Sequence, residues 1–114
     1  MYEVLSTKAF VNTTSGDFSR AVRMEGANSV QVEFTVYSVS GTPTTTTLEV
    51  QESNDLENWT TYPSTSYSGT NTVSTSVGCT SFRASSISSQ YVRLRWKVSA
   101  NTAVVGAGIN TALL

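Results

Sequence analysis

The sequence predicts an all-β protein built as a two-sheet antiparallel β-sandwich, and three observations lead to that prediction. Short segments rich in Val, Thr and aromatic residues follow one another at the spacing of an all-β domain. The segment QYVRLRWKVSA at 90–100 alternates strictly between polar and apolar side chains, which is the period of a half-buried strand. No segment shows sustained helical periodicity. We expect eight or nine strands in a jelly-roll-like or other Greek-key order, with an immunoglobulin-type sandwich as the alternative.

The composition fits one folded domain over residues 1–114. A chain of 114 residues has room for a single core. Charged residues make up 13% of it and hydrophobic residues 39%, a balance unlike that of disordered chains. The sequence holds 18 Ser and 18 Thr, and threonine, like valine, fits a pleated strand well.

The first half of the chain is predicted to hold four strands. Segments 2–11 and 18–24 flank the turn sequence NTTSGD, whose Gly and Asp suit a loop. Segments 29–39 and 44–53 follow, separated by a Gly-Thr-Pro break, and in both the apolar residues alternate with polar ones. The residues expected to face the core are Val30, Val32, Phe34, Val36, Leu48 and Val50.

The second half is predicted to hold five strands, of which 72–77 and 80–85 are the weaker ones, joined by turns at Asn54-Asp55, Gly78 and Ala100-Asn101. These strands span 59–62, 72–77, 80–85, 90–99 and 102–113. Trp96 lies on the apolar side of its strand and is expected in the core.

The side-chain inventory argues against catalysis, and we expect a protein that is not an enzyme and needs no cofactor. The chain has no histidine, which removes the commonest general base and most zinc and iron sites. Glycoside hydrolysis needs only two carboxyl groups, and Glu49, Glu52, Asp55 and Glu57 lie close in sequence. Such an enzyme also needs a long cleft, which a domain of this size supplies poorly.

Two further residue sets have a chemical and a structural interpretation. Asn54, Asp55 and Glu57 offer hard oxygen ligands for calcium, but an Asn-Asp turn that ends a strand is the commoner use of such residues. Cys79 is the single cysteine and has no basic neighbour in sequence, so a small buried filler is expected rather than a nucleophile. We therefore predict no metal site and no catalytic residue.

Charge and hydropathy limit the partners. The formal net charge of −1 predicts no attraction to nucleic acid, and we expect Glu33 and Glu49 to pair with the basic stripe Arg93, Arg95 and Lys97. No segment approaches the ~20 apolar residues of a membrane helix, so no membrane partner is expected. The N-terminal sequence lacks the pattern of a secretory signal, which predicts folding in a cytoplasm.

Aromatic residues near the Asn-Asp turn are the candidates for ligand recognition, because exposed Tyr and Trp often carry binding energy. Trp59 follows the turn and is expected either to plug the end of the sandwich or to stand exposed. The possible ligand-binding residues are Asn54, Trp59, Tyr62 and Tyr67.

The segment TAVVGAGINTALL at 102–114 is unusually apolar for a chain end, where order is commonly lost. It is expected either to form a central core strand or to dock against a neighbouring subunit, and a trimer or a larger lattice would use such a contact. The possible interface residues are Val104, Val105, Ile109, Leu113 and Leu114.

The stretch VQESNDLENWT at 50–60, followed by YVR at 91–93, resembles two groups of β-sandwich proteins. One is the discoidin or coagulation-factor C-type domain, which implies binding of glycans or lipid head groups through loops at one end. The chain departs from that pattern with Leu56 where glycine is usual and with no cysteine pair. The other group is the small head-decoration, fibre and capsid-associated proteins of tailed phages. This chain resembles those proteins in the turn, in the YVRLR strand and in a last strand that carries Ala and Gly.

The resemblance and the inventory together predict a non-enzymatic structural protein of a phage or virus-like particle, as a capsid decoration, fibre or tail-associated component. Its expected partners are further copies of itself and other virion proteins, with assembly in the host cytoplasm. The alternative is a discoidin-like carbohydrate-binding module, for which a glycan would be the partner.

Overall fold

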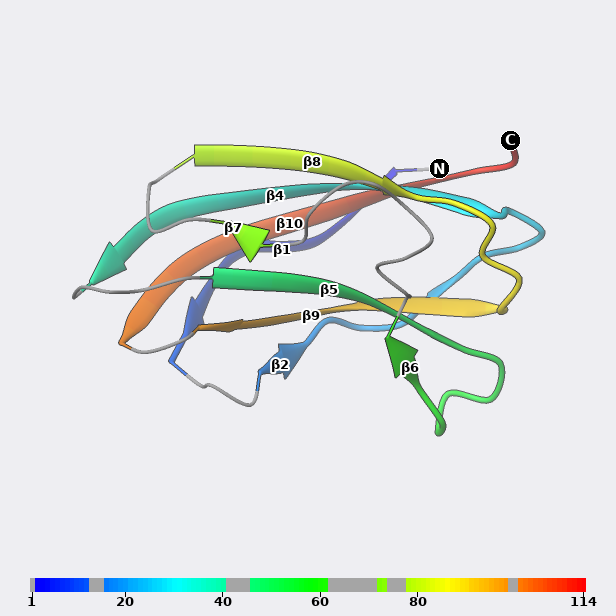
Figure 1. Cartoon of the computed structure of the whole chain (residues 1–114), viewed down its shortest axis with the longest axis horizontal. Helices are drawn as coiled ribbons and strands as arrows, with labels where there is room; N and C mark the ends of the chain where they lie inside the picture. The colour runs from blue at the N-terminus through cyan, green and yellow to red at the C-terminus, as the bar shows by residue number, and fades with distance from the viewer. Residues whose placement is uncertain (1, 13–15, 41–45, 62–71, 74–77, 99–100) are drawn as a thin grey trace.

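The computed structural model describes residues 2–12, 16–40, 46–61, 72–73, 78–98 and 101–114, which form two antiparallel sheets packed face to face (Figure 1). Sheet A contains, in spatial order, β1 (Tyr2–Val11), β10 (Thr102–Ala112), β4 (Ser29–Ser40) and β8 (Gly78–Ala84). Sheet B contains β2 (Asp17–Phe18), β9 (Tyr91–Val98), β5 (Thr46–Ser53) and β6 (Thr60–Thr61), with β3 (Val22–Arg23) on β9 and β7 (Thr72–Val73) on β5. The predicted all-β sandwich is confirmed.

The strand order is that of a jelly roll. Both β2 and β3 pair with β9, and both β6 and β7 pair with β5, so each pair acts as one interrupted edge strand. Ten strands then reduce to eight, ordered first, eighth, third, sixth in sheet A and second, seventh, fourth, fifth in sheet B. Among the jelly-roll-like, other Greek-key and immunoglobulin-type alternatives, the structure therefore has the jelly-roll order, a double Greek key in which consecutive strands mostly alternate between sheets.

The segment predicted as one strand over 18–24 is instead split in two by Ser19. Its backbone N–H donates to Leu94 O at 2.8 Å, but the N–H of Leu94 is accepted by the Ser19 hydroxyl rather than by a backbone carbonyl. A side chain therefore replaces one bond of the ladder, which separates β2 from β3.

The tight turn predicted at Gly78 is wrong. Gly78 is the first residue of β8 and pairs with Val36 of β4 in sheet A. The preceding strand, β7, pairs with β5 in sheet B. The two strands therefore belong to different layers and form no hairpin.

The core lies between the two sheets and follows the predicted alternation. Sheet A contributes the inward residues of β4 and β10, and sheet B those of β5 and β9. Trp96 is 5% exposed, as predicted for a core residue. The largest fully buried side chains are Phe34, Leu48, Leu94 and Ile109.

Cys79 was expected as a buried filler, and that prediction is wrong. The residue is exposed on β8, where it pairs with Thr35 of β4. The neighbouring core positions on β4 are filled by Phe34 and Val36 instead, so Cys79 falls on the outward side of the pleat.

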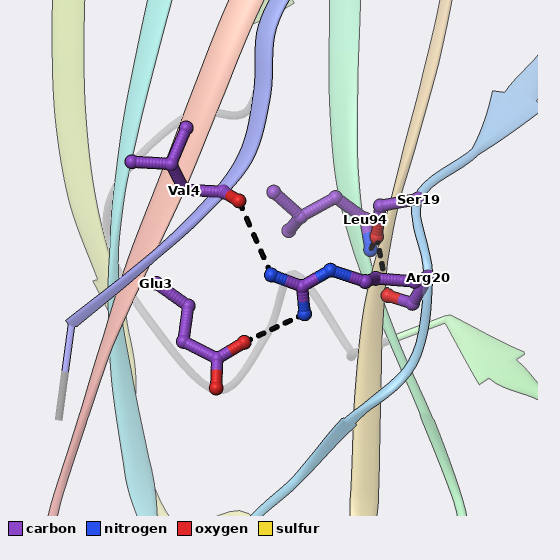
Figure 2. Close-up of polar contacts among 5 residues, drawn as sticks. All are labelled: Glu3, Val4, Ser19, Arg20 and Leu94. Atoms are coloured by element: carbon purple, nitrogen blue, oxygen red, sulfur yellow. Dashed lines mark hydrogen bonds and ion pairs between the residues drawn. The ribbon is translucent and has the colours of Figure 1, made fainter.

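Arg20 joins the two sheets at the edge where β1 and the β2–β3 segment meet (Figure 2). Its Nη1 lies 2.7 Å from Glu3 Oε2, and its Nη2 donates to the backbone oxygen of Val4 at 3.3 Å. Ser19, next to it, is held on Leu94 of β9. Arg20 therefore bridges from sheet B to the outer backbone of the edge strand of sheet A.

In the described part of the chain, no helix has the length and apolarity needed to cross a membrane.

Candidate functional site

Two of the four predicted ligand-binding residues lie in the loop between β5 and β6. Asn54 Oδ1 accepts a hydrogen bond from Gln90 N at 3.0 Å, which ties this loop to the segment before β9. Trp59 donates from Nε1 to Leu56 O at 3.1 Å. Both side chains are thus used in holding the loop. The other two residues, Tyr62 and Tyr67, lie outside the described residues.

Asp55 is the centre of this loop. Its Oδ1 accepts hydrogen bonds from the backbone N–H groups of Glu57 and Asn58 at 2.9 and 2.8 Å, and from the Ser53 hydroxyl at 3.0 Å. Its Oδ2 accepts from Asn58 Nδ2 at 2.7 Å. The carboxylate thus acts as a turn acceptor, and among the described residues no group of three or more His, Cys, Asp or Glu side chains is placed to hold a metal.

Hydrogen bonds from Asn58, Glu57 and Ser53 lower the pKa of Asp55 well below its ordinary value. Because the folded pKa lies below the unfolded value of ~3.9, the ionised carboxylate stabilises the fold above that pH. This contribution is lost as the pH falls towards the folded pKa. We expect the urea midpoint of the wild type to fall more steeply than that of Asp55→Asn as the pH decreases from about 5 to about 2. Glu25→Gln, in another exposed turn, is the matched control, and equal slopes for wild type and Asp55→Asn would contradict the prediction.

Leu56 occupies the left-handed backbone region with a φ of 66°, a conformation that glycine adopts at lower cost. We expect Leu56→Gly to raise the free energy of unfolding by about 0.5–1 kcal/mol, because relief of ~1–2 kcal/mol of strain exceeds the entropy cost of glycine. Leu56→Ala keeps the strained φ and should bring no gain. Chemical unfolding of both variants checks this, and an equal gain for both would show that the side chain, not the backbone, is responsible.

The outer face of sheet B carries a stack of two rings around a guanidinium. The Arg93 guanidinium carbon lies 3.9 Å from the centre of the Phe18 ring and 4.2 Å from that of Trp59, while Nε donates to Gln51 Oε1 at 2.8 Å. Desolvation, and then the charge of Arg95, lower the pKa of Arg93. Trp59 therefore neither plugs the end of the sandwich nor projects alone, but packs on this face.

The basic stripe on β9 is paired in part as predicted. Glu49 lies 3.3 Å from Arg95 Nη1 and 3.4 Å from Lys97 Nζ. Glu33, the second expected partner, belongs to β4 in sheet A and lies on a different face of the molecule.

The predicted interface residues divide into two groups. Val105 and Ile109 face the core of the chain itself, because β10 is an inner strand of sheet A. Val104 is half-buried, whereas Leu113 and Leu114 are 75% and 69% exposed. The backbone of Leu114 is nevertheless fixed, since its N–H and C=O both pair with the Asn28 amide at 3.0 and 3.1 Å.

A shallow cleft of about 230 Å³ lies on the outer face of sheet A, over β10 and between β1 and β4. Its floor is formed at Gly106 and Gly108. A Cβ on Gly108 would lie 2.5 Å from the Tyr2 hydroxyl, and one on Gly106 would lie 3.0 Å from the Tyr37 ring. The two glycines therefore let both rings lie down against the strand, while Tyr2 and Tyr37 remain 52% and 43% exposed.

Glu33 supplies the charge of this cleft. The Tyr2 hydroxyl donates to Glu33 Oε2 at 3.2 Å. Partial desolvation of Tyr2, and then the Glu33 carboxylate, raise the pKa of the phenol above its ordinary value. On the other side, Lys8 Nζ lies 5.1 Å from the centre of the Tyr37 ring.

This cleft was not predicted from the sequence. Its residues come from both ends and the middle of the chain, and only the pairing of β1 and β4 with β10 brings them together. A signal was present, however, because glycine at alternate positions of a strand marks a close approach of another group.

The chain matches no protein-family model and no curated protein sequence. Solved structures share its fold. The PBSX exported protein XepA matches 100% of this chain with a TM-score of 0.67 and 19% identity, and this chain spans only 37% of XepA. A CBM4 carbohydrate-binding module matches 97% of this chain and 75% of its own length, with a TM-score of 0.59 and 11% identity. The CBM22-1 xylan-binding domain from Paenibacillus barcinonensis Xyn10C matches 99% and 86%, with a TM-score of 0.54 and 9% identity. At these identities the likeness establishes the fold.

Proposed function

We propose that this chain is a non-enzymatic structural component of a phage or virus-like particle. The observation that carries the proposal is the match over the whole chain to the PBSX exported protein XepA, at the TM-score given above. Such a component acts by contacting other copies of itself and other particle proteins, and it catalyses no reaction.

The surface supports such a role. Four exposed apolar or aromatic side chains, Tyr2, Val4, Phe10 and Tyr37, lie on the outer face of sheet A. Contiguous exposed apolar groups of this kind commonly mark protein contact sites. The exposed Leu113 follows β10 and lies beside a backbone fixed by Asn28, so it is presented in a fixed position.

The test begins with particles purified from the organism that encodes the chain. Mass spectrometry and cryo-electron microscopy should find the chain in a fixed number of copies per particle. Sedimentation of the isolated chain should then show an oligomer that Leu113→Asp with Leu114→Asp dissociates. Leu56→Asp, at an exposed leucine elsewhere, is the control. A chain that stays monomeric and is absent from particles would overturn the proposal.

Carbohydrate recognition is the second candidate function. It is favoured by the fold shared with two carbohydrate-binding modules and by the cleft with two exposed tyrosine rings. A panel of soluble oligosaccharides tests it by isothermal titration calorimetry, and the candidate fails if none of them binds.

A further inference from the structure

The cleft on sheet A is shaped by irregular strand pairing. All three register shifts in the described pairing of the sheets fall beside it. Two lie in β1 within residues 4–9, and the third lies in β4, where the pairing with β10 passes over Tyr37. Bulges of this kind turn a side chain out of its regular direction, and they occur often next to binding sites. Here they accompany the two glycines that let Tyr2 and Tyr37 lie down.

The groups in the cleft match an amphipathic ring better than an apolar or a charged ligand. Tyr2 offers an apolar ring face and Tyr37 an aromatic wall, while Glu33 and the hydroxyl of Thr35 offer hydrogen-bond partners in the same cleft. A purely apolar ligand would leave these polar groups unpaired on binding. A sugar ring presents C–H groups on its faces and hydroxyls at its rim, so it meets both kinds of surface.

The volume of the cleft and the charges around it restrict the class of ligand further. The volume of about 230 Å³ lies below the ~300–1,000 Å³ of sites for drug-sized ligands, which suits one ring of a longer chain. A cationic group is disfavoured at the Tyr37 ring, because Lys8 already places an ammonium over it. At Glu33 the Tyr2 hydroxyl already donates to the carboxylate.

We infer that this cleft binds one neutral pyranose ring of a glycan, with the exposed Tyr2 ring as the stacking surface, Tyr37 as the wall beside it and Glu33 as the acceptor for its hydroxyl groups. The inference rests on the second candidate function, carbohydrate recognition, and assigns Tyr2 and Tyr37 to a glycan in place of a protein contact. It also moves the site from the loop at Asn54 and Trp59 to the opposite sheet.

The test is a titration of the full chain with xylotriose, cellotriose, chitotriose and mannotriose by calorimetry and by amide chemical shifts. At least one trisaccharide should bind, with the shifts centred on β1, β4 and β10. Tyr2→Ala and Tyr37→Ala should each weaken binding by about tenfold or more. Glu33→Gln keeps the side-chain shape and should weaken binding by roughly threefold or more.

Phe10→Ala is the matched control, because Phe10 is an exposed aromatic residue of β1 that does not line the cleft. It should bind like the wild type, and the unfolding midpoint of every variant confirms its fold. If both tyrosine variants still bind the sugar and Trp59→Ala does not, the cleft is not the binding site. Carbohydrate recognition by the chain would then still hold. If no trisaccharide binds at concentrations up to about 10 mM, which would detect even weak binding, both the inferred site and carbohydrate recognition are wrong. Binding of tetramethylammonium in place of every sugar shows a cation site and also overturns the inference.

Discussion

Phe34→Ala is expected to lower the free energy of unfolding by about 3–5 kcal/mol, the usual cost of removing a buried phenylalanine. Phe34 on β4 is 0% exposed, and its partner on the neighbouring strand β10 is Ala107. The small side chain of Ala107 leaves space for the ring between the sheets. Because domains of this size are stable by only ~5–15 kcal/mol, the loss is a large share of the total. Urea unfolding followed by tryptophan fluorescence measures it.

The control for this substitution is Phe10→Ala, which removes the same ring from a position that is 62% exposed. Its expected effect is within about 0.5 kcal/mol, since surface substitutions away from special contacts change stability little. Similar losses for the two variants would show that the core is not centred between the sheets.

Gly106→Ala is expected to cost about 1–3 kcal/mol, which is the range for inserting a methyl group into a space already filled. The new Cβ would lie 2.7 Å from the backbone oxygen of Thr7, so β1 itself has to move. Gly78→Ala is the matched control in another strand of the same sheet, because nothing lies within 4 Å of a Cβ at that position. The control should be neutral or gain up to about 1 kcal/mol from the less flexible unfolded chain.

Thermal and urea unfolding of the two glycine variants give the comparison. If Gly106→Ala were as stable as Gly78→Ala, the close approach of β1 to β10 would not exist in solution. The tyrosine rings over β10 would then also lack the support that the cleft requires.

The sequence was sufficient for the strands whose signal is local. The predicted segment 2–11 coincides with β1, and 90–99 differs from β9 by one residue at each end. In these segments the alternation of side chains is dictated by the burial of one face, so the pattern can be read without knowing the partner strand. The inward direction of Trp96 follows from the same argument.

Features that depend on distant partners could not be predicted. The break between β2 and β3 exists because the Ser19 hydroxyl meets Leu94, which lies far along the chain. The jelly-roll order, the outward direction of Cys79 and the layer of Gly78 depend likewise on which strands pair. The sequence of a single strand does not show which other strands it will pair with.

The candidate site shows the same division. The polar turn at Asn54 and Asp55 was correctly located, but its side chains are used within the loop and in bracing Gln90. The cleft depends on Tyr2, Glu33 and Gly108, which meet only when β1, β10 and β4 are side by side. For a site built across three strands, the only local signal was the pair of alternate glycines in β10, Gly106 and Gly108.

The contacts of Arg20 with Glu3 and Val4 affect how copies of this chain can associate at high concentration. A continuous intermolecular sheet can grow only if each molecule offers an open strand at both sides. Arg20 occupies the Val4 carbonyl on one side of sheet A, and the bulges in β1 interrupt the spacing that an incoming strand would have to match. When many molecules stand close together, addition of a further strand at this edge of sheet A is therefore disfavoured.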